Sequence, residues 1–451
     1  MSISADTRSI SDPDTGGCHV PQTLIAVIID SLRHSKLFKD SFWAVFGNGV
    51  GNAMMLLAGI LIARFLGKDL YGEYGVVKTT MFYVAAFATF GLGFTSTKYV
   101  AQYVSTHREY VRSIIRDAMA ITMAFSGAIA ILLMAFARPL ADYVGAPSLS
   151  LAFRALAVVI VFKAVATTQT GVLSGFKDFK VVARNTCLSG VFMIVTCVPL
   201  TYFGGLRGSL LALALSQAFN AFINHLAIRR LSRQLDHQVS RDFRRELFRF
   251  SLPVALQESS FTVCHWTAVM LLTKYASVGE LGMYSAGAQW NSIILMIPSL
   301  LSNVVLSYLA GSLGDRRQHS RTVRLMLLVN LITTLLPFAF VYAFAGFIAS
   351  FYGPTFVGLA SLMRIMTFTT ILESCSSVFK SELMAQGRTW LLFTLRFLRD
   401  LIFVAVVYLL LSRRSAADGA HTYAMCSVAV GAAFFVVMWL VYIIPSKQDN
   451  G

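Results

Sequence analysis

The chain has 451 residues, of which 56% are hydrophobic and only 13% are charged, and its mean hydropathy is +0.66. Soluble proteins carry about twice this share of charged residues, which excludes an ordinary soluble fold. The net charge of +16 would suit a nucleic-acid-binding protein, but the positions of the basic residues indicate a membrane topology instead. A membrane β-barrel would show short segments of alternating polarity, and these are absent.

Apolar windows of about 20 residues recur along the chain and predict an all-α polytopic membrane protein with twelve transmembrane helices. The expected spans are 42–65, 76–102, 114–136, 149–174, 181–203, 207–228, 247–273, 280–309, 323–345, 356–384, 389–411 and 420–444.

The second half of the chain repeats the first half at an offset of 210 residues. Gly72 and Tyr74 correspond to Gly282 and Tyr284, and Arg64 corresponds to a lysine. Six spans in each half is an even number, so both halves insert in the same orientation, related by an axis along the membrane normal. We therefore expect an N-lobe at 41–228 and a C-lobe at 247–444, with a cavity between them that permits alternating access.

Lysine and arginine residues favour the two tails and the even-numbered connections by about four to one. This bias places both termini in the cytoplasm, with tails at 1–40 and 445–451 and a basic cytoplasmic linker at 229–246. The linker is suited to lie on anionic lipid. The basic charge is thus a topology signal, and nucleic acid is not an expected partner.

Every other connection is short, and the chain contains no P-loop, no HExxH sequence and no metal-ligand spacing of its cysteines. We therefore expect no catalytic residues, no bound cofactor and no metal site.

Ionisable side chains inside apolar spans are costly and are therefore candidates for function. In the fourth span Lys163, Thr167 and Thr170 lie on one helical face, and in the tenth span Glu373 and Lys380 occupy positions equivalent to the first and last of these. The matched stripes predict water-filled walls of a cavity. The alternative is that they hold the helices of each lobe together.

The first and seventh spans form a third matched pair. Asn48 and Asn52 share a face of the first span, and Glu258 and His265 share a face of the seventh span. Glu258 and His265 are candidates for binding a coupling cation or proton. The alternative for Glu258 is a structural carboxylate neutralised by a neighbouring helix.

The eleventh span carries Arg396, Arg399 and Asp400. Arg396 and Asp400 are four residues apart and can form an ion pair within one helix. This pairing would leave Arg399 as a free positive charge, and a guanidinium fork suits phosphate oxygens.

The segments LGKDLYGEYGVVKTT and FGLGFTSTKYVAQY, and their second-half counterpart VGELGMYSAGAQW, resemble the polysaccharide-type (Wzx-like) flippases. The turns GVLSGFKDF and LMAQGRTW are also similar to that family, which belongs to the multidrug/oligosaccharidyl-lipid/polysaccharide exporter (MOP) superfamily. The resemblance implies two six-helix lobes in a V around a cationic cavity. It also implies transfer of an undecaprenyl-diphosphate-linked oligosaccharide across the bacterial inner membrane, from the cytoplasmic to the periplasmic leaflet, driven by a proton or sodium gradient.

On this interpretation Lys163, Arg396 and Arg399 meet the diphosphate, and polar stripes receive the sugars. Partners are the lipid bilayer, the lipid-linked glycan, and polysaccharide polymerase or glycosyltransferases of the same pathway. The expected substrate-binding residues are Asn48, Asn52, Lys163, Thr167, Thr170, Arg396 and Arg399. The expected ion-coupling residues are Glu258, His265, Glu373 and Asp400.

Two other functions stay open. A cation-coupled multidrug exporter would use the same fold but needs an acidic, aromatic pocket, whereas the first span offers asparagines. A membrane glycosyl transferase, polymerase or ligase would need catalytic side chains on a sizeable periplasmic loop. The longest outward loops have about a dozen residues, which is typical of simple connections.

Overall fold

A computed structural model of the chain describes residues 36–143, 150–233, 235, 241–311, 316–413 and 418–443. Within these ranges all regular elements are helices. The helices occupy each of the twelve predicted spans to within a few residues at their ends, which confirms the all-α fold. The N-terminal tail predicted at 1–40 lies almost wholly outside the described residues, as does the C-terminal tail.

The first half of the chain contains two very long helices, and each is bent at a glycine that lies between two predicted spans. Gly67 has φ of 72° and Gly205 has φ of 52°, a region that glycine enters without the steric cost paid by other residues. The helices of this half are α2 (Lys36–Ala88), α3 (Leu92–Thr106), α4 (Val111–Tyr143), α5 (Ser150–Gly175) and α6 (Phe179–Ser232), with a 3-10 turn, η1, at Arg108–Tyr110.

The second half is divided into more elements, because breaks occur near the middle of the eighth span and after the ninth. Its helices are α7 (Arg244–Tyr275), α8 (Val278–Ile294), α9 (Met296–Gly311), α10 (Arg316–Ala343), α11 (Ala345–Ser350), α12 (Leu359–Ala385), α13 (Thr389–Arg413) and α14 (Gly419–Ile443). At the start of α8 the Ser277 hydroxyl accepts a hydrogen bond from the Glu280 backbone N–H at 3.1 Å. The Glu280 carboxylate accepts one from the Ala420 N–H at 2.8 Å, which fixes α8 to α14.

In the described part of the chain six helices are long and apolar enough to cross a membrane, namely α2, α4 with its preceding turn, α5, α6, α10 and α14. Helices α7, α12 and α13 carry the charged residues that the sequence places at membrane depth, and these residues lower their hydropathy. The chain is a multi-pass membrane protein. The number of twelve crossings stays a prediction.

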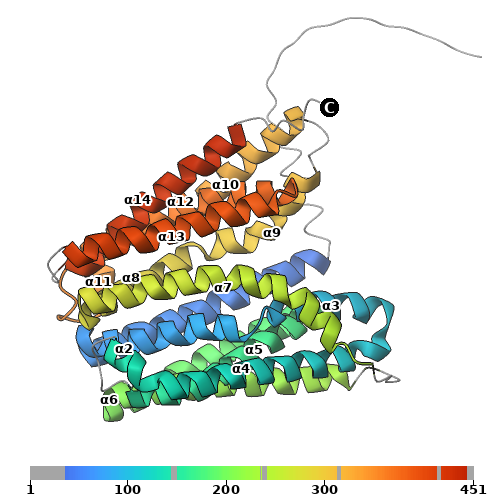
Figure 1. Ribbon diagram of the computed structural model, residues 1–451, viewed down its shortest axis with the longest axis horizontal. Coiled ribbons are helices and arrows are strands. Elements are labelled where there is room, and N and C mark those ends of the chain that lie inside the picture. The colour runs from blue at the N-terminus through green and yellow to red at the C-terminus, as the bar shows by residue number, and fades with distance from the viewer. Residues whose placement is uncertain are drawn as a thin grey trace, which may run out of the picture.

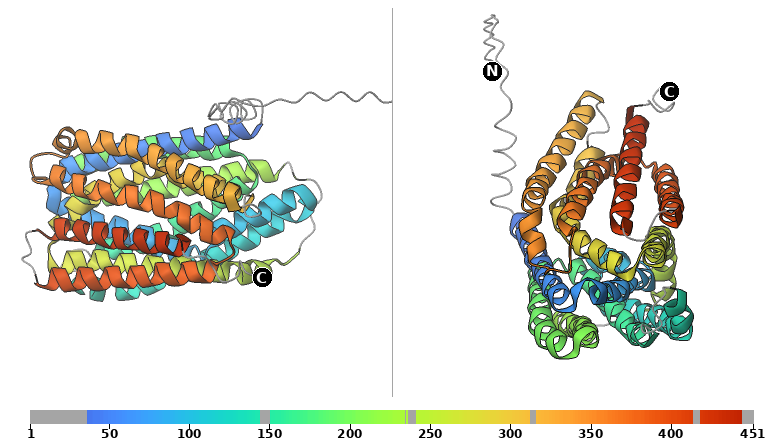
Figure 2. Two further views of the ribbon diagram at one scale, coloured as in Figure 1. Left: turned by 90° about the horizontal axis from the view of Figure 1, so that it is seen from above. Right: turned by 90° about the vertical axis from the view of Figure 1, so that its left-hand side faces the viewer.

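The helices form two bundles, with α2–α6 on one side and α8–α14 on the other (Figure 1). Helix α7 runs between them and contacts α13 as well as α2, α3 and α4. The end-on view separates the same two bundles (Figure 2). The two bundles agree with a two-lobed fold, and the lobe bounds of 41–228 and 247–444 stay predictions.

The lobes meet most closely where α2 crosses α8. A Cβ atom on Gly72 would lie 1.9 Å from the Val278 carbonyl oxygen, and one on Gly282 would lie 2.3 Å from that of Lys68. Only glycine permits so close an approach of the two backbones. Beside this crossing, the Gln289 amide of α8 donates a hydrogen bond to the Tyr71 hydroxyl of α2.

The start of α7 is attached to the N-lobe. The buried carboxylate of Asp117 on α4 accepts hydrogen bonds from the Phe243 backbone N–H at 2.9 Å and from Arg116 Nε at 3.0 Å. Farther along α7, the Ser251 hydroxyl lies 2.7 Å from the Thr95 hydroxyl of α3, and both residues are buried. Helix α7 thus begins on one lobe and continues into the other.

Candidate transport site

A cavity of about 370 Å³ lies inside the C-lobe, between α7, α8, α12, α13 and α14. Tyr83 of α2 is the one lining residue from the N-lobe among those described. The ionisable residues on its wall are His265, Glu373, Lys380, Arg399 and Asp400, together with Tyr83 and Tyr284. Four predicted site residues from three different helices are therefore brought together here: His265, Glu373, Arg399 and Asp400.

Asp400 is the centre of the charged group. Its side chain is only 3% exposed, and Arg399 Nε donates a hydrogen bond to its Oδ1 at 2.8 Å. His265 of α7 places Nε2 3.8 Å from the same oxygen. The His265 ring packs against Phe261, with 4.2 Å between ring centroids, and against Phe403 at 5.7 Å. Because burying a carboxylate is costly unless it is paired, these contacts compensate the burial of Asp400.

The expected pairing of Arg396 with Asp400 is wrong. The Asp400 side chain points toward its neighbour Arg399. An ion pair with Arg396 would require it to extend along the helix axis by about one turn instead. The Arg396 guanidinium instead lies over the Phe261 ring, 5.9 Å from its centroid. Its Nε is buried and has no hydrogen-bond partner among the described residues. Of the two arginines beside Asp400, Arg399 is the one in an ion pair, and Arg396 forms none within the described ranges.

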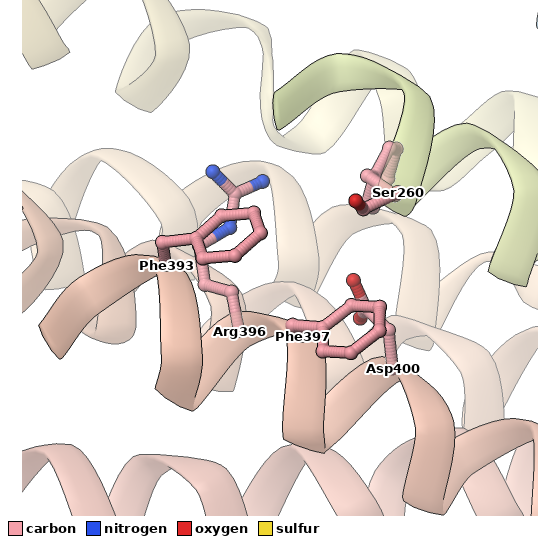
Figure 3. A pocket seen from close by; sticks show the side chains of 6 residues that line it. Ser260, Phe393, Arg396, Phe397 and Asp400 are labelled. Carbon is pink, nitrogen blue, oxygen red and sulfur yellow. The ribbon is translucent and has the colours of Figure 1, made fainter. Parts of the chain in front are cut away.

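Arg396 lines a second, narrow cleft between α7 and α13 (Figure 3). Ser260 faces it from α7, and Phe393, Phe397 and Asp400 face it from α13. Phe261 and Asp400 line both hollows, so the cleft adjoins the larger cavity.

On α12, Glu373 and Lys380 both line the cavity, two helical turns apart. Two carboxylates, Glu373 and Asp400, face two cations, Lys380 and Arg399, so the fixed charges on the wall balance. The cavity lies at the lower end of the volumes found for small-molecule sites. This arrangement suits a small ligand or a cation. A carboxylate on the wall binds such a cation after the lysine or arginine paired with it has moved away.

The predicted polar stripe on α5, formed by Lys163, Thr167 and Thr170, does not line this cavity. The Thr170 hydroxyl donates to the Ala166 carbonyl at 2.9 Å and accepts from Asn224 of α6 at 3.4 Å. Asn224 in turn accepts from Asn185 at 2.9 Å. Thr170 thus belongs to a polar network between α5 and α6. For this residue the contacts favour the alternative interpretation, in which the stripe holds the helices of one lobe together. Its assignment to the substrate is not supported by these contacts.

Lys163 and Thr167, on the same face of α5, remain accessible. The Thr167 hydroxyl donates to the Lys163 carbonyl at 2.9 Å, and its side chain is exposed. Lys163 is half-buried and forms no ion pair with any residue that the structure describes. Lys163 thus lies inside a predicted span without an acidic partner in the described part of the chain.

The first and seventh spans contribute less to this site than expected. The side chain of Asn48 lies outside the described residues, and that of Asn52 is exposed on α2. Glu258 is exposed on α7 and lines neither hollow. Of the four predicted coupling residues, the other three lie on the cavity wall, and their role stays a prediction.

Several lining residues had not been singled out as site residues. Tyr284, Ala288 and Asn291 of α8, and Leu295 directly after it, follow one another at helical spacing along the cavity wall. The Asn291 amide donates to the Met366 carbonyl at 3.1 Å and to Thr369 at 3.2 Å. Two signals in the sequence pointed to this wall: Tyr284 is the repeated tyrosine, and Asn291 is an amide two helical turns after it. Within the described part of the chain no cluster of His, Cys, Asp and Glu could hold a metal ion.

Comparison with known proteins identifies the family. The sequence profile described as polysaccharide biosynthesis protein matches residues 37–310, which is more than half of the chain. The chain belongs to the polysaccharide biosynthesis protein family. This assignment agrees with the resemblance seen in the repeated glycine- and tyrosine-rich segments.

Curated relatives of this polysaccharide biosynthesis family protein are export and transport proteins by name. EpsE of Ralstonia nicotianae, an EPS I polysaccharide export inner membrane protein, is 28% identical over 46% of this chain and 50% of the relative. ExoT of Rhizobium meliloti, a succinoglycan biosynthesis transport protein, is 24% identical over 65% of this chain and 57% of the relative. A putative O-antigen transporter of Shigella flexneri is 19% identical over 92% of this chain and 100% of the relative. The chain thus spans about half to three-fifths of the length of the first two.

Solved structures confirm the fold of this family member. An inward-facing multidrug resistance MATE family transporter of the MOP superfamily aligns with a TM-score of 0.74, at 15% identity, over 87% of this chain and 94% of that one. An outward-facing MATE family transporter aligns with a TM-score of 0.61, at 14% identity, over 91% and 96%. At these identities the likeness shows the MATE-like fold alone.

Proposed function

We propose that this polysaccharide biosynthesis family protein is a flippase that moves undecaprenyl-diphosphate-linked oligosaccharide from the cytoplasmic to the periplasmic leaflet, for the synthesis of cell-surface polysaccharide. The family assignment and the transport and export names of the relatives support this proposal. So does the two-lobed fold. No bond is made or broken in such a transfer, so the protein acts as a transporter and not as an enzyme.

The observation that carries the proposal concerns two of the predicted site residues, which are basic and lie on membrane helices. Lys163 of α5 and Arg396 of α13 form no ion pair within the described ranges. A charge at membrane depth is costly unless a ligand or water compensates it. The diphosphate of a prenyl-linked sugar is an anion that enters from the lipid and supplies this compensation. The exposed side chains of Asn52 and Thr167 would then contact the sugars, and the prenyl chain would remain in lipid.

The cavity inside the C-lobe is better suited to the coupling ion than to the glycan. Its volume of about 370 Å³ suits a small ligand, whereas a lipid-linked oligosaccharide is much larger. We assign a proton or sodium ion to Asp400, with His265 and Glu373 on the same wall. Binding of that cation would release Arg399 from Asp400, and the ion pair is therefore the two-state element that could couple the gradient to movement of the lobes.

The proposed location is the bacterial inner membrane with both termini in the cytoplasm, as the distribution of basic residues predicts. The linker between α6 and α7 would then lie on the anionic inner surface. Polysaccharide polymerase and glycosyltransferases of the same pathway are the proposed partners.

A cation-coupled multidrug exporter is a second candidate, and one observation favours it. The C-lobe cavity is lined by Tyr83, Phe261 and Tyr284 and by the carboxylates of Glu373 and Asp400, which is the aromatic, acidic pocket that an exporter of cationic drugs needs. The cations Lys380 and Arg399 on the same wall offset these carboxylates, so the pocket has no net negative charge to attract a cationic drug. We therefore rank the exporter second.

Reconstitution in liposomes separates the two candidates. The purified chain is given a short-chain lipid-linked oligosaccharide with a fluorescent sugar, and transfer between leaflets is followed with a membrane-impermeant quencher under an imposed pH or sodium gradient. The flippase proposal predicts gradient-dependent transfer of the glycan lipid and no accumulation of cationic dyes. Dye transport without glycan transfer would establish the exporter instead.

A further inference from the structure

One aromatic contact between the two lobes reaches the ion pair of the C-lobe cavity. The Tyr83 side chain of α2 lines that cavity from the N-lobe and stacks on the His265 ring of α7. We infer that Tyr83 is a positioning residue, which transmits a change at the ion pair of Asp400 to the N-lobe through His265. This inference rests on the proposed function and deepens it, because it names the side chain that links ion binding to movement of the lobes.

The contact runs from ring to ring to carboxylate. The centroids of the Tyr83 and His265 rings are 6.5 Å apart and the ring planes differ by 25°, which is within the range of favourable aromatic pairs. His265 Nε2 lies 3.8 Å from Asp400 Oδ1. One turn before Tyr83 on α2, Thr80 Oγ1 accepts a hydrogen bond from Trp266 Nε1 at 3.3 Å. Two consecutive residues of α7 therefore contact the same stretch of α2.

The His265 ring has aromatic neighbours from three helices. It packs against Phe261 of α7, Phe403 of α13 and Tyr83 of α2. Of these three, only Tyr83 belongs to the N-lobe. Packed side chains shift between discrete arrangements and do not deform continuously. A cation that enters the ion pair changes the charge next to the imidazole, and a ring that turns in response displaces Tyr83.

The ionisable side chains that line the cavity around Tyr83 belong to the C-lobe. Within the described part of the chain they are His265, Tyr284, Glu373, Lys380, Arg399 and Asp400. The repeat of 210 residues gives the N-lobe no second cluster of this kind, because the residue equivalent to Asp400 is Gly190. Tyr83 is also unmatched, since its equivalent is Ile293. A single ion cluster and a single aromatic contact therefore serve both lobes.

Tyr83 lies where a rotation of the lobes has a large effect. It follows Gly72, the point where α2 crosses α8, by eleven residues, which is about 16 Å along the helix axis. A rigid-body rotation of about 15° at this crossing would displace Tyr83 by about 4 Å. Such a displacement separates the two rings, because aromatic attraction requires centroids within about 7 Å. The stacked and separated arrangements are thus two distinct states, and the structure shows the stacked one.

The distance between the cytoplasmic ends of the two lobes tests the inference without any glycan. Lys180→Cys and Trp390→Cys place nitroxide labels at exposed, equivalent positions near the starts of α6 and α13, in a full-length chain without its native cysteines. Pulsed electron paramagnetic resonance in nanodiscs records the label distances as the pH is lowered or as sodium replaces potassium. We expect one of these cations to shift the distances in the labelled parent. Tyr83→Ala should reduce that shift by about fivefold or more, because the coupling contact is lost.

Three further variants separate coupling from packing. Tyr83→Phe keeps the ring and should keep the response to the cation. Tyr83→Leu fills similar space without a ring and should respond as weakly as Tyr83→Ala, so it replaces the alanine variant if that one does not fold. Phe87→Ala removes an exposed ring from the same helix that lines neither hollow, and it should respond as the parent does.

The outcomes distinguish this inference from the proposed function. A full response in Tyr83→Leu or Tyr83→Ala would overturn the inference and leave the flippase proposal standing. Loss of the response in Tyr83→Phe or Phe87→Ala would also overturn it, because the effect would then not come from the stacked ring. A labelled parent that responds to neither cation would overturn it too, whereas the flippase proposal is decided separately by transfer of the glycan lipid in liposomes.

Discussion

Gly72 of α2 and Gly282 of α8 lie against each other at the crossing of the two lobes, and their contacts are reciprocal. A Cβ on Gly72 would meet the carbonyl oxygen of Val278, and a Cβ on Gly282 would meet that of Lys68. Lys68 and Val278 are themselves 210 residues apart, as Gly72 and Gly282 are. Equivalent residues meet in this way only on a twofold axis. The duplication therefore places its own symmetry axis at the contact between lobes.

The first prediction concerns this crossing. Gly72→Ala and Gly282→Ala each force the two backbones apart, since the added methyl group would lie about 2 Å from a carbonyl oxygen. We expect each to lower the free energy of unfolding by about 1–3 kcal/mol and to reduce transport. Thermal unfolding in detergent measures the first effect and the liposome assay measures the second.

Gly127 on α4 supplies the control, because a Cβ there would have no neighbour within 4 Å. Gly127→Ala should be neutral or slightly stabilising, since alanine is favoured over glycine within a helix. Equal destabilisation by all three substitutions would show that the crossing is not special.

The second prediction concerns the contact between α3 and α7. The hydroxyl oxygens of Thr95 and Ser251 are 2.7 Å apart, so sulfur atoms in their places need to move by less than about 1 Å to form a disulfide bond. In a background without the native cysteines, Thr95→Cys with Ser251→Cys should cross-link on oxidation. If the lobes separate here during the cycle, oxidation stops transport and a reducing agent restores it. Transport at the full rate by the cross-linked protein would show that this contact stays closed throughout.

The third prediction concerns Asp117, which holds the first turn of α7 on the N-lobe through the Phe243 N–H. Asp117→Ala leaves a buried N–H without its acceptor, and we expect a loss of about 1–3 kcal/mol in the free energy of unfolding. Asp117→Asn keeps an acceptor oxygen and should lose less. Hydrogen exchange of the amides at 243–247 should be faster in the alanine variant than in the asparagine variant. Unchanged exchange in both variants would refute the anchoring role.

The fourth prediction concerns the ion pair in the C-lobe cavity. Asp400→Asn removes the charge that binds Arg399 and the proposed cation, while it preserves the size of the side chain. We expect transport to lose its dependence on the imposed gradient, although binding of the carrier lipid persists. Arg364 is an exposed arginine on α12 that lines neither hollow. Arg364→Gln is therefore the control and should keep the gradient dependence. A gradient dependence that survives in Asp400→Asn would move the coupling site elsewhere.

The sequence carries the large-scale organisation of this protein more reliably than its charge pairing. The offset between Gly72 and Gly282 predicts both the duplication and the pair of residues found on the axis. Hydropathy places helices at all twelve spans, because burial in lipid demands long apolar segments. The helical face shared by Glu258 and His265 was less informative, since only His265 turns inward to the cavity.

Two features of the site depended on side-chain geometry that a sequence does not contain. Arg396 lies four residues before Asp400 and Arg399 is its immediate neighbour. Which of the two pairs with Asp400 depends on how the Asp400 side chain is oriented. Thr170 has the same periodicity as Lys163, yet the amide of Asn224 from α6 engages it. The position of the cavity within the C-lobe also follows from how α7 packs on α13, which no periodicity predicts.

In the proposed transport cycle, Lys163 and Arg396 carry the diphosphate-linked glycan across the bilayer. The most direct measurement compares leaflet transfer of a fluorescent lipid-linked oligosaccharide by Lys163→Gln/Arg396→Gln with that by Arg154→Gln/Arg413→Gln. The second pair removes one exposed arginine from each of the same two helices, α5 and α13. We expect the first pair to lower the transfer rate by about tenfold or more and the second pair to stay within about twofold of wild type. Wild-type transfer by the first pair would contradict it.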